Sequence, residues 1–298
     1  MNNNKPKFSI AIQTDKYQNL IKNTLGDPER ARRFVASISS AVAINNDLQE
    51  CTANTILSGA LLGEALNLSP SPQLGHYYLV PFKKKAFNQE TKTYEVVETN
   101  ATFILGYKGY IQLAVRSGQY RDLDVIEIKK GEFKGRNSLT GKLEFSFMQN
   151  EVERKDKETI GYLAYFELLN GFQKKLFMTK EEMIDYADKY SQAFNKKSFE
   201  LLIAGKIPEK DMYKYSSFWY KDFDEMAKKT MLRRLISKWG IMSIDMQQAI
   251  EKDDTISNID GTYYYPETID DSKIIESKIE ENNSSAETQV KSVNIDEI

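Results

Sequence analysis

Residues 94–116 read YEVVETNATFILGYKGYIQLAVR, and the hydrophobic period changes within this stretch. Tyr94–Leu105 is rich in Tyr, Val, Thr, Phe and Ile, the residue types that favour a β-strand. From Tyr107 onward, apolar residues recur at helical spacing, which predicts a short helix that ends at Ser117, just before Gly118. The stretch therefore predicts a strand followed by a helix.

Helices are expected before this stretch. Asp27-Pro28-Glu29 combines a capping residue, a proline suited to the first helical position and an acid that favours the positive end of the helix dipole. A second helix, at about 52–66, is rich in small residues and can pack closely. Residues 1–25 show no clean period and are expected to form an N-terminal arm.

Further strands are expected on both sides of the helix at 107–117, and helices after them. The predicted strands are 76–82, 120–130, 144–148, 160–169 and 173–179, with residues 83–93 as a long polar hairpin tip. The predicted later helices are 179–190, 198–204 and 217–238. This order predicts an α+β fold with N-terminal helices, a mostly antiparallel sheet with one inserted helix, C-terminal helices and an acidic flexible tail.

Charge divides the chain more sharply than the overall net charge of −2 suggests. Residues 251–298 contain 13 Asp and Glu and 4 Lys, a net of −9, which leaves +7 for residues 1–250. We expect a core at 26–250 that binds a polyanion and a flexible tail at 251–298 that contacts a partner. A solvated surface with a disordered tail is the alternative.

Composition excludes several classes of protein. One cysteine and one histidine are too few for an internal disulfide and argue against a Cys/His zinc site or a His-based triad. The sequence contains no Gly-x-x-x-x-Gly-Lys-Ser/Thr loop, and no run approaches the about 18 apolar residues of a membrane span. Met1–Lys5 opens no signal peptide, so a cytoplasmic protein is expected.

The helix at 107–117 carries the first candidate contact with nucleic acid. Lys108, Gln112 and Arg116 recur every four residues and share one face. Two cations and an amide in a row suit a string of phosphate oxygens, and Gly106 allows another backbone to approach. An exposed polar face on a core helix is the alternative.

The long helix at 217–238 carries the second candidate contact with nucleic acid. Lys228 falls within the apolar sector with Glu225, so a bond to Glu225, to a phosphate or to both is expected. Lys229 and Arg233 border that sector. Trp219 and Tyr220 could stack bases beside these cations, although such aromatic residues are more often part of a core.

Two basic positions on strands complete the candidates. Lys83 and Lys84 begin a lysine run at the hairpin tip, where they could contact phosphate or keep an exposed edge strand soluble. Arg121, at the start of the strand at 120–130, is added as a further cation.

A metal-dependent nuclease is the enzymatic alternative. Asp122 and Asp124 alternate on one strand face, and Glu132-Phe133-Lys134 adds a carboxylate and a lysine that could hold Mg²⁺ and orient a water. However, Glu127-Ile128-Lys129 matches the same short pattern, so the pattern has little specificity.

Four segments resemble the RecT family of phage single-strand annealing proteins. They are LGYKGYIQLA at 105–114, MAKKTMLRRL at 226–235, GEALNLSP at 63–70 and GHYYLVPF at 75–82. The similarity runs in order from about 27 to 245. Lys108, Gln112, Lys228, Lys229 and Arg233 lie at motif positions, so the resemblance implies a DNA-contact role for them.

The resemblance also implies an activity. It implies an ATP-independent recombinase, phage- or prophage-encoded in a bacterial host, that coats single-stranded DNA and pairs it with a complementary strand in a helical filament. A phage exonuclease and the host single-strand-binding protein are the implied partners. Annealing makes and breaks no covalent bond, so no cofactor and no catalytic residue are expected. A DNA-coating protein without annealing activity remains an alternative.

Overall fold

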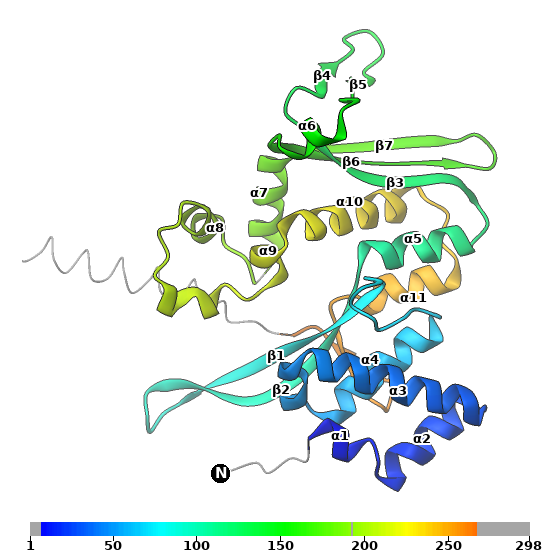
Figure 1. The fold of residues 1–298 in the computed structure, drawn as a ribbon, viewed down its shortest axis with the longest axis vertical. Coiled ribbons are helices and arrows are strands. Elements are labelled where there is room, and N and C mark those ends of the chain that lie inside the picture. Colours follow the sequence, from blue (N-terminus) through cyan, green and yellow to red (C-terminus); the bar gives the residue numbers. More distant parts are fainter. Residues whose placement is uncertain (1–6, 192, 267–298) are drawn as a thin grey trace, which may run out of the picture. The chain divides into compact units, whose positions relative to one another are not determined.

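The computed structural model describes residues 7–191 and 193–266. Helices combine with strands that pair only antiparallel within this part of the chain, which confirms the α+β class. The described residues form two compact units (Figure 1). The core unit contains the residues up to Thr179 together with Asp224–Pro266, and the helical unit contains Lys180–Phe223.

The elements have the following bounds. The helices up to residue 155 are α1 (Phe8–Ala11), α2 (Asp15–Leu25), α3 (Pro28–Ile44), the 3₁₀ helix η1 (Asn46–Glu50), α4 (Ala53–Ala65), α5 (Tyr107–Arg116) and α6 (Glu151–Lys155). The later helices are α7 (Lys180–Tyr190), α8 (Lys196–Ile203), η2 (Glu209–Lys214), α9 (Phe218–Lys221), α10 (Phe223–Trp239) and α11 (Ile244–Lys252). The strands are β1 (Tyr77–Asn88), β2 (Thr93–Leu105), β3 (Tyr120–Lys129), β4 (Phe133–Arg136), β5 (Leu143–Phe145), β6 (Thr159–Leu168), β7 (Gln173–Thr179), β8 (Ile256–Ser257) and β9 (Tyr263–Tyr264).

The N-terminal segment is folded rather than an arm. Residues 8–25 form α1 and α2, and the side chains of Phe8, Ile12 and Ile21 are buried. Helix α1 is too short to show a period, whereas α2 carries apolar residues at helical spacing, Tyr17, Leu20, Ile21 and Leu25, which the prediction of an arm overlooked. The predicted start of α3 is confirmed, since the Asp27 carboxylate accepts a hydrogen bond from the Glu29 backbone amide at 2.8 Å.

Helix α4 packs against β1 through its glycines. A Cβ atom on Gly59 would lie 2.7 Å from the Leu79 side chain, and one on Gly63 would lie 2.3 Å from the Tyr77 ring. The close packing predicted from the small residues of this helix is therefore confirmed.

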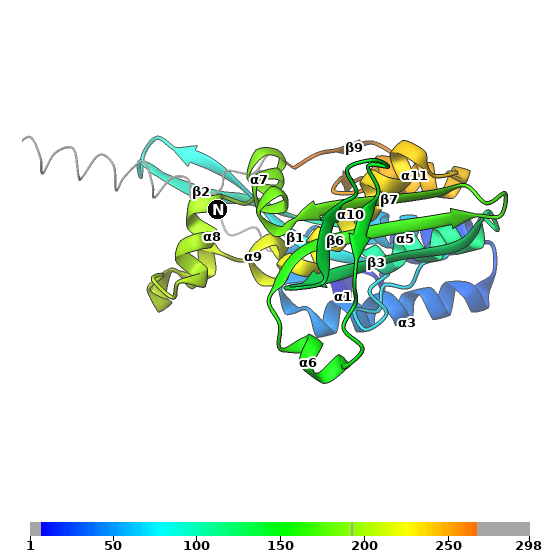
Figure 2. The ribbon, with the colours of Figure 1, turned by 90° about the horizontal axis from the view of Figure 1, so that it is seen from above.

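The predicted single sheet is divided into separate sheets. β1 and β2 form a two-stranded hairpin, β3, β6 and β7 form a three-stranded sheet, and α5 connects the two (Figures 1 and 2). The strands of the hairpin extend to Asn88 and Thr93, through the polar stretch predicted as a tip. The outer part of this two-stranded ribbon is largely exposed on both faces, so no alternation of apolar and polar residues marks it.

Helix α10 lies along one face of the β3–β6–β7 sheet (Figure 1). The Tyr162 hydroxyl donates to Asp224, and the Arg234 guanidinium donates to the Met178 sulfur at 3.0 Å. The helix predicted at 217–238 is divided into α9 and α10, because Asp222 between them has a non-helical backbone (φ −148°, ψ 63°). None of the described helices is both long and apolar enough to cross a membrane.

The predicted boundary of the acidic tail at 250 is wrong. Residues 251–257 pack on the core: the Phe103 amide donates to the Thr255 carbonyl and the Asp254 amide to the Phe103 carbonyl, each at 2.9 Å. Asp253 is fully buried. A polar composition concealed this segment, because its contribution is a few buried polar contacts rather than an apolar stripe. Residues 267–298, for which a partner contact was expected, lie outside the described residues.

Candidate nucleic-acid interface

Two glycines allow Gly75 and His76, directly before β1, to lie against the first turn of α5. The Gly106 amide donates to the His76 carbonyl at 2.9 Å. A Cβ atom on Gly106 would lie 2.1 Å from the Gly75 carbonyl oxygen, and one on Gly109 would lie 2.2 Å from the His76 carbonyl oxygen. Only glycine fits at both positions, so the close approach predicted at Gly106 is confirmed.

This packing leaves one face of α5 open to solvent. Lys108, Gln112 and Arg116 are exposed, whereas Tyr110 and Leu113 are buried on the other side. The stripe predicted from the spacing is therefore present. Arg116 also has a structural role, because its guanidinium donates to the carbonyl of Leu66 at 2.7 Å, at the C-terminal end of α4.

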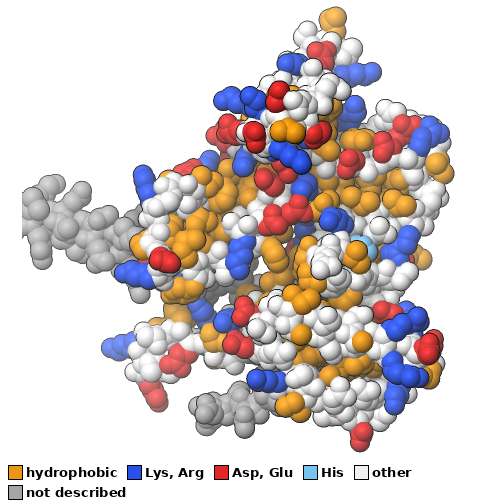
Figure 3. All heavy atoms as spheres, in the orientation of Figure 1, with side chains coloured by type: hydrophobic (Ala, Val, Ile, Leu, Met, Phe, Trp, Pro, Cys, Tyr) orange, Lys and Arg blue, Asp and Glu red, His pale blue; other side chains and the backbone are white. Residues whose placement is uncertain are grey.

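His76 lies beside this stripe and is affected by two of its cations. Burial lowers the pKa of its imidazole, and the charges of Arg116 and Lys108 lower it further. The imidazole accepts a hydrogen bond from the Ser69 amide through Nδ1 at 3.3 Å, as a neutral ring can. In Figure 3 the one histidine lies at the surface with basic side chains on either side. The charges of Lys108 and Arg116 suit a phosphate.

Tyr107 brings the two predicted basic segments together. The Lys108 ammonium lies 5.9 Å and the Lys228 ammonium 4.9 Å from the centre of the Tyr107 ring. Lys228 also forms the predicted ion pair with Glu225 and a second one with Glu127, at 3.7 Å. Burial lowers the pKa of Lys228, but Glu225, Tyr107 and Glu127 together outweigh this effect, so the pKa is raised and the group stays charged. The sequence analysis missed Tyr107, whose only signal was its position beside Lys108.

Lys229 is buried and Arg233 is half-buried, and both form ion pairs within the protein. The Lys229 ammonium is buried and lies 2.9 Å from Asp253 and 3.1 Å from Asp254. Arg233 lies 3.4 Å from each of the same carboxylates. The sequence predicted Lys229 and Arg233 at the border of the apolar sector of the helix, and their ion pairs with Asp253 and Asp254 are compatible with that position. The spacing along the helix gave no indication that the carboxylates at 253–254 would pair with these two cations.

Trp219 and Tyr220 are also buried, within the helical unit. Their exposed fractions are 7% and 8%, and both rings contact Phe194. The Tyr220 hydroxyl accepts a hydrogen bond from the Asn195 amide at 2.8 Å. These residues form an aromatic core, so the stacking role predicted for them is not supported by their positions.

The remaining predicted cations are exposed. Arg121 forms an ion pair with Glu167 at 2.6 Å, and Lys83 lies 3.6 Å from Glu50. Lys84 has no carboxylate partner among the described residues. None of the three lies on α5 or α10.

The residues proposed for a nuclease do not assemble into a metal site. Glu132 is buried, and its carboxylate accepts hydrogen bonds from Arg154 at 2.7 Å and from the Lys129 amide at 2.8 Å. Asp124 accepts from the Val125 amide at 2.7 Å. No group of three or more His, Cys, Asp or Glu side chains in the described part of the chain is placed to hold a metal ion.

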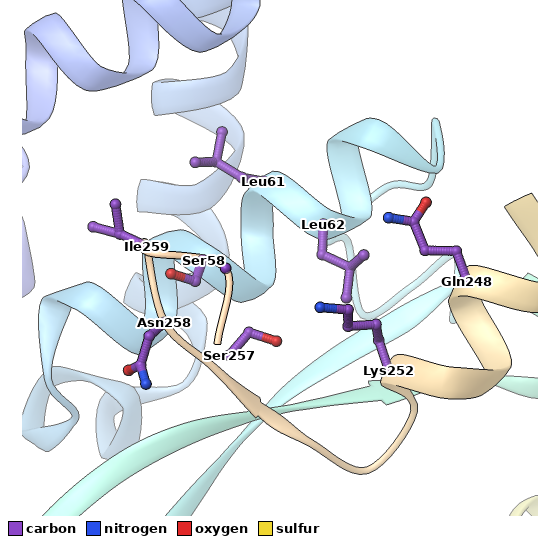
Figure 4. Close-up of a pocket in the computed structure, with 9 residues that line it drawn as sticks. Ser58, Leu61, Leu62, Gln248, Lys252, Ser257, Asn258 and Ile259 are labelled. Carbon is purple, nitrogen blue, oxygen red and sulfur yellow. The ribbon is translucent and has the colours of Figure 1, made fainter. Parts of the chain in front are cut away.

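A pocket of about 160 Å³ lies between α4, α11 and the segment at 257–261 (Figure 4). Its lining includes Leu61, Leu62 and the ammonium-bearing Lys252. It is smaller than the roughly 300–1,000 Å³ of most ligand pockets. A nucleic acid strand is too extended to be enclosed by this pocket, and the exposed face of α5 provides an open surface instead.

Comparison with known proteins identifies the family of the chain. The RecT family model matches residues 32–271. An uncharacterized protein YqaK of Bacillus subtilis (strain 168) is 36% identical over 251 residues, which cover 84% of this chain and 72% of that protein. Protein RecT of Escherichia coli (strain K12) is 28% identical over 225 residues, which cover 75% of this chain and 71% of that protein. The matched region contains α5 and α10 entirely, and the chain belongs to the RecT family.

Proposed function

We propose that this protein is an ATP-independent single-strand annealing protein of phage recombination. Membership of the RecT family supports a role in single-strand annealing and recombination in general. The observation that carries the specific proposal is the exposed stripe of α5, with the cations Lys108 and Arg116 on one face of the helix. The same two cations also contribute, after burial, to the lowered pKa of the neighbouring His76, and a surface with unopposed cations favours a phosphate.

The proposed mechanism uses charge rather than bond chemistry. Two complementary strands repel each other, and cations on the protein reduce this repulsion by neutralising phosphates. Contacts to the backbone carry no sequence information and leave the base edges free to pair. Lys108 and Gln112 are the proposed contacts, with Lys228 contributing charge beside Tyr107.

We further propose that copies of the chain assemble along the strand as a helical filament. A single stripe gives weak binding, whereas a row of copies adds contacts along one strand and makes binding cooperative. A phage exonuclease that produces the single strand and the host single-strand-binding protein are the proposed partners in the cell.

The test is the sequential addition of two complementary oligonucleotides to the protein without nucleotide. Faster pairing than in protein-free solution, with a long-lived complex that contains both strands, supports annealing. Binding of the first strand without faster pairing indicates a coating protein. Cleavage on addition of Mg²⁺ indicates a nuclease.

A further inference from the structure

Trp239 is held at a fixed position at the C-terminal end of α10. The Tyr120 hydroxyl of β3 donates to the Ile241 carbonyl at 2.8 Å. A Cβ atom on Gly240 would lie 2.4 Å from the same hydroxyl. This contact anchors the end of α10 to the sheet, and it leaves Trp239 half-buried.

Two lysines lie against the Trp239 ring. The ammonium of Lys174, on β7, is 4.7 Å from the ring centre, and that of the neighbouring Lys238 is 4.8 Å away. Neither ammonium has a carboxylate partner among the described residues. Both charges are therefore available to an external anion, in contrast to Lys229 and Arg233.

Exposed apolar side chains lie two residues along the chain from Lys174 and from Trp239. Phe172, in the turn between β6 and β7, is 45% exposed, and Ile241 is 41% exposed. An aromatic ring with unpaired cations and an apolar rim is the composition of a surface that stacks bases and holds the adjoining phosphates.

This surface is close to the stripe on α5. Only the three residues 117–119 separate Arg116 from Tyr120. The Cα atoms of Arg116 and Tyr120 are therefore at most about 14 Å apart. Tyr120 in turn contacts Gly240 and Ile241, directly after Trp239. The end of the stripe at Arg116 is thus joined to Trp239 through Tyr120.

We infer that Trp239, Lys174 and Lys238 form a second contact for single-stranded DNA, in which a base stacks on the indole and the two ammonium groups hold the flanking phosphates. This inference rests on the proposed function, since it extends the binding surface of the same strand. It also transfers to Trp239 the stacking role that the sequence suggested for Trp219 and Tyr220.

The chain provides its own reporter, because it contains only two tryptophans. In a Trp219→Phe variant, Trp239 is the only tryptophan, and its emission is selected by excitation at a wavelength that tyrosine does not absorb. Trp239→Phe leaves only the buried Trp219 and is the matched control. A thymidine oligonucleotide is titrated into each variant while binding is followed independently by the anisotropy of a labelled strand. Quenching in Trp219→Phe that saturates together with the anisotropy, and none in Trp239→Phe, is the expected result.

Affinity provides the second readout. Trp239→Ala should weaken single-strand binding by about 5- to 150-fold, while Trp239→Phe retains most of the affinity. Lys174→Ala and Lys238→Ala should each lower the slope of log affinity against log salt by about 0.7. A thermal melt of each variant establishes that it is folded.

The outcomes separate this inference from the proposed function. If strands bind and anneal but the Trp219→Phe fluorescence does not change, the Trp239 contact is wrong and annealing stands. The contact is equally wrong if folded Trp239→Ala binds as tightly as the unsubstituted protein. If no strand binds at all, the proposed function fails and this inference fails with it.

Discussion

The Lys229 ammonium and the Asp253 carboxylate form a buried ion pair, 2.9 Å apart, that joins α10 to the segment after α11. Asp253 also accepts hydrogen bonds from the Leu105 amide at 2.9 Å and from the Tyr110 hydroxyl at 3.0 Å. The pair therefore links β2, α5 and α10 at one point, and Lys229 contributes to folding rather than to DNA contact.

Lys229→Ala should lower the free energy of unfolding by about 3–5 kcal/mol, because the substitution leaves the Asp253 carboxylate buried without its closest cation. Urea denaturation measures this change. Lys108→Ala, at an exposed position on α5, serves as the control and should change stability by less than about 0.5 kcal/mol. A loss below about 1 kcal/mol for Lys229→Ala would contradict the structural role.

Two truncations should separate the folded C-terminal segment from the remainder of the chain. A chain that ends at Glu251 lacks Asp253 and the backbone bonds between Phe103 and Thr255, so it should unfold or melt far earlier. A chain that ends at Pro266 retains these contacts and should anneal naked strands like the full chain. Circular dichroism melts and an annealing assay test both. Equal melting of the two truncations would be incompatible with this account.

Asp253 also illustrates what the sequence could not predict. The start of α3 at Asp27-Pro28 and the face of α5 follow from local spacing, and both are confirmed. The partners of Asp253 are 24 and 143 residues away along the chain, at Lys229 and Tyr110. No local pattern reveals such a pairing.

The aromatic residues show a second reason why the sequence could not predict the whole site. A run of Trp, Tyr and Phe has the same composition whether it forms a core or stacks bases, and only the surrounding residues decide between the two. Trp219 contacts Phe194 and Phe223, whereas Trp239 lies beside two lysines. The spacing of residues along one helix could not predict the contacts of either tryptophan.

The pKa of His76 should rise when its basic neighbours are removed or neutralised. Burial, Arg116 and Lys108 lower this pKa, the two cations because they repel the protonated imidazole. Lys108→Ala should therefore move it upward, and a bound oligonucleotide should do the same. His76 is the only histidine, so an NMR pH titration of its imidazole signals is unambiguous. A pKa that does not change with DNA would place the strand elsewhere.

Glu132 should make the fold sensitive to acid. Burial raises the pKa of this carboxyl, but the hydrogen bonds from Arg154 and from the Lys129 and Met148 amides outweigh burial, so the pKa lies below its ordinary value of 4.5. The stability gained is present above that ordinary value and is lost as the pH falls through the lowered pKa. Arg154→Ala should remove about 3–5 kcal/mol at neutral pH. Denaturation between pH 7 and 3 measures both effects, and an unchanged Arg154→Ala curve would refute the role of the pair.

The most direct test of the central claim is the rate at which two complementary labelled strands pair, measured by energy transfer without ATP. The comparison is between the unsubstituted protein, Lys108→Ala on α5 and Lys22→Ala on α2, two exposed lysines whose loss changes the net charge equally. The account predicts fast pairing with the unsubstituted protein and with Lys22→Ala, and pairing slowed at least severalfold with folded Lys108→Ala. Pairing no faster than in protein-free solution, or equal rates for Lys108→Ala and the unsubstituted protein, would contradict it.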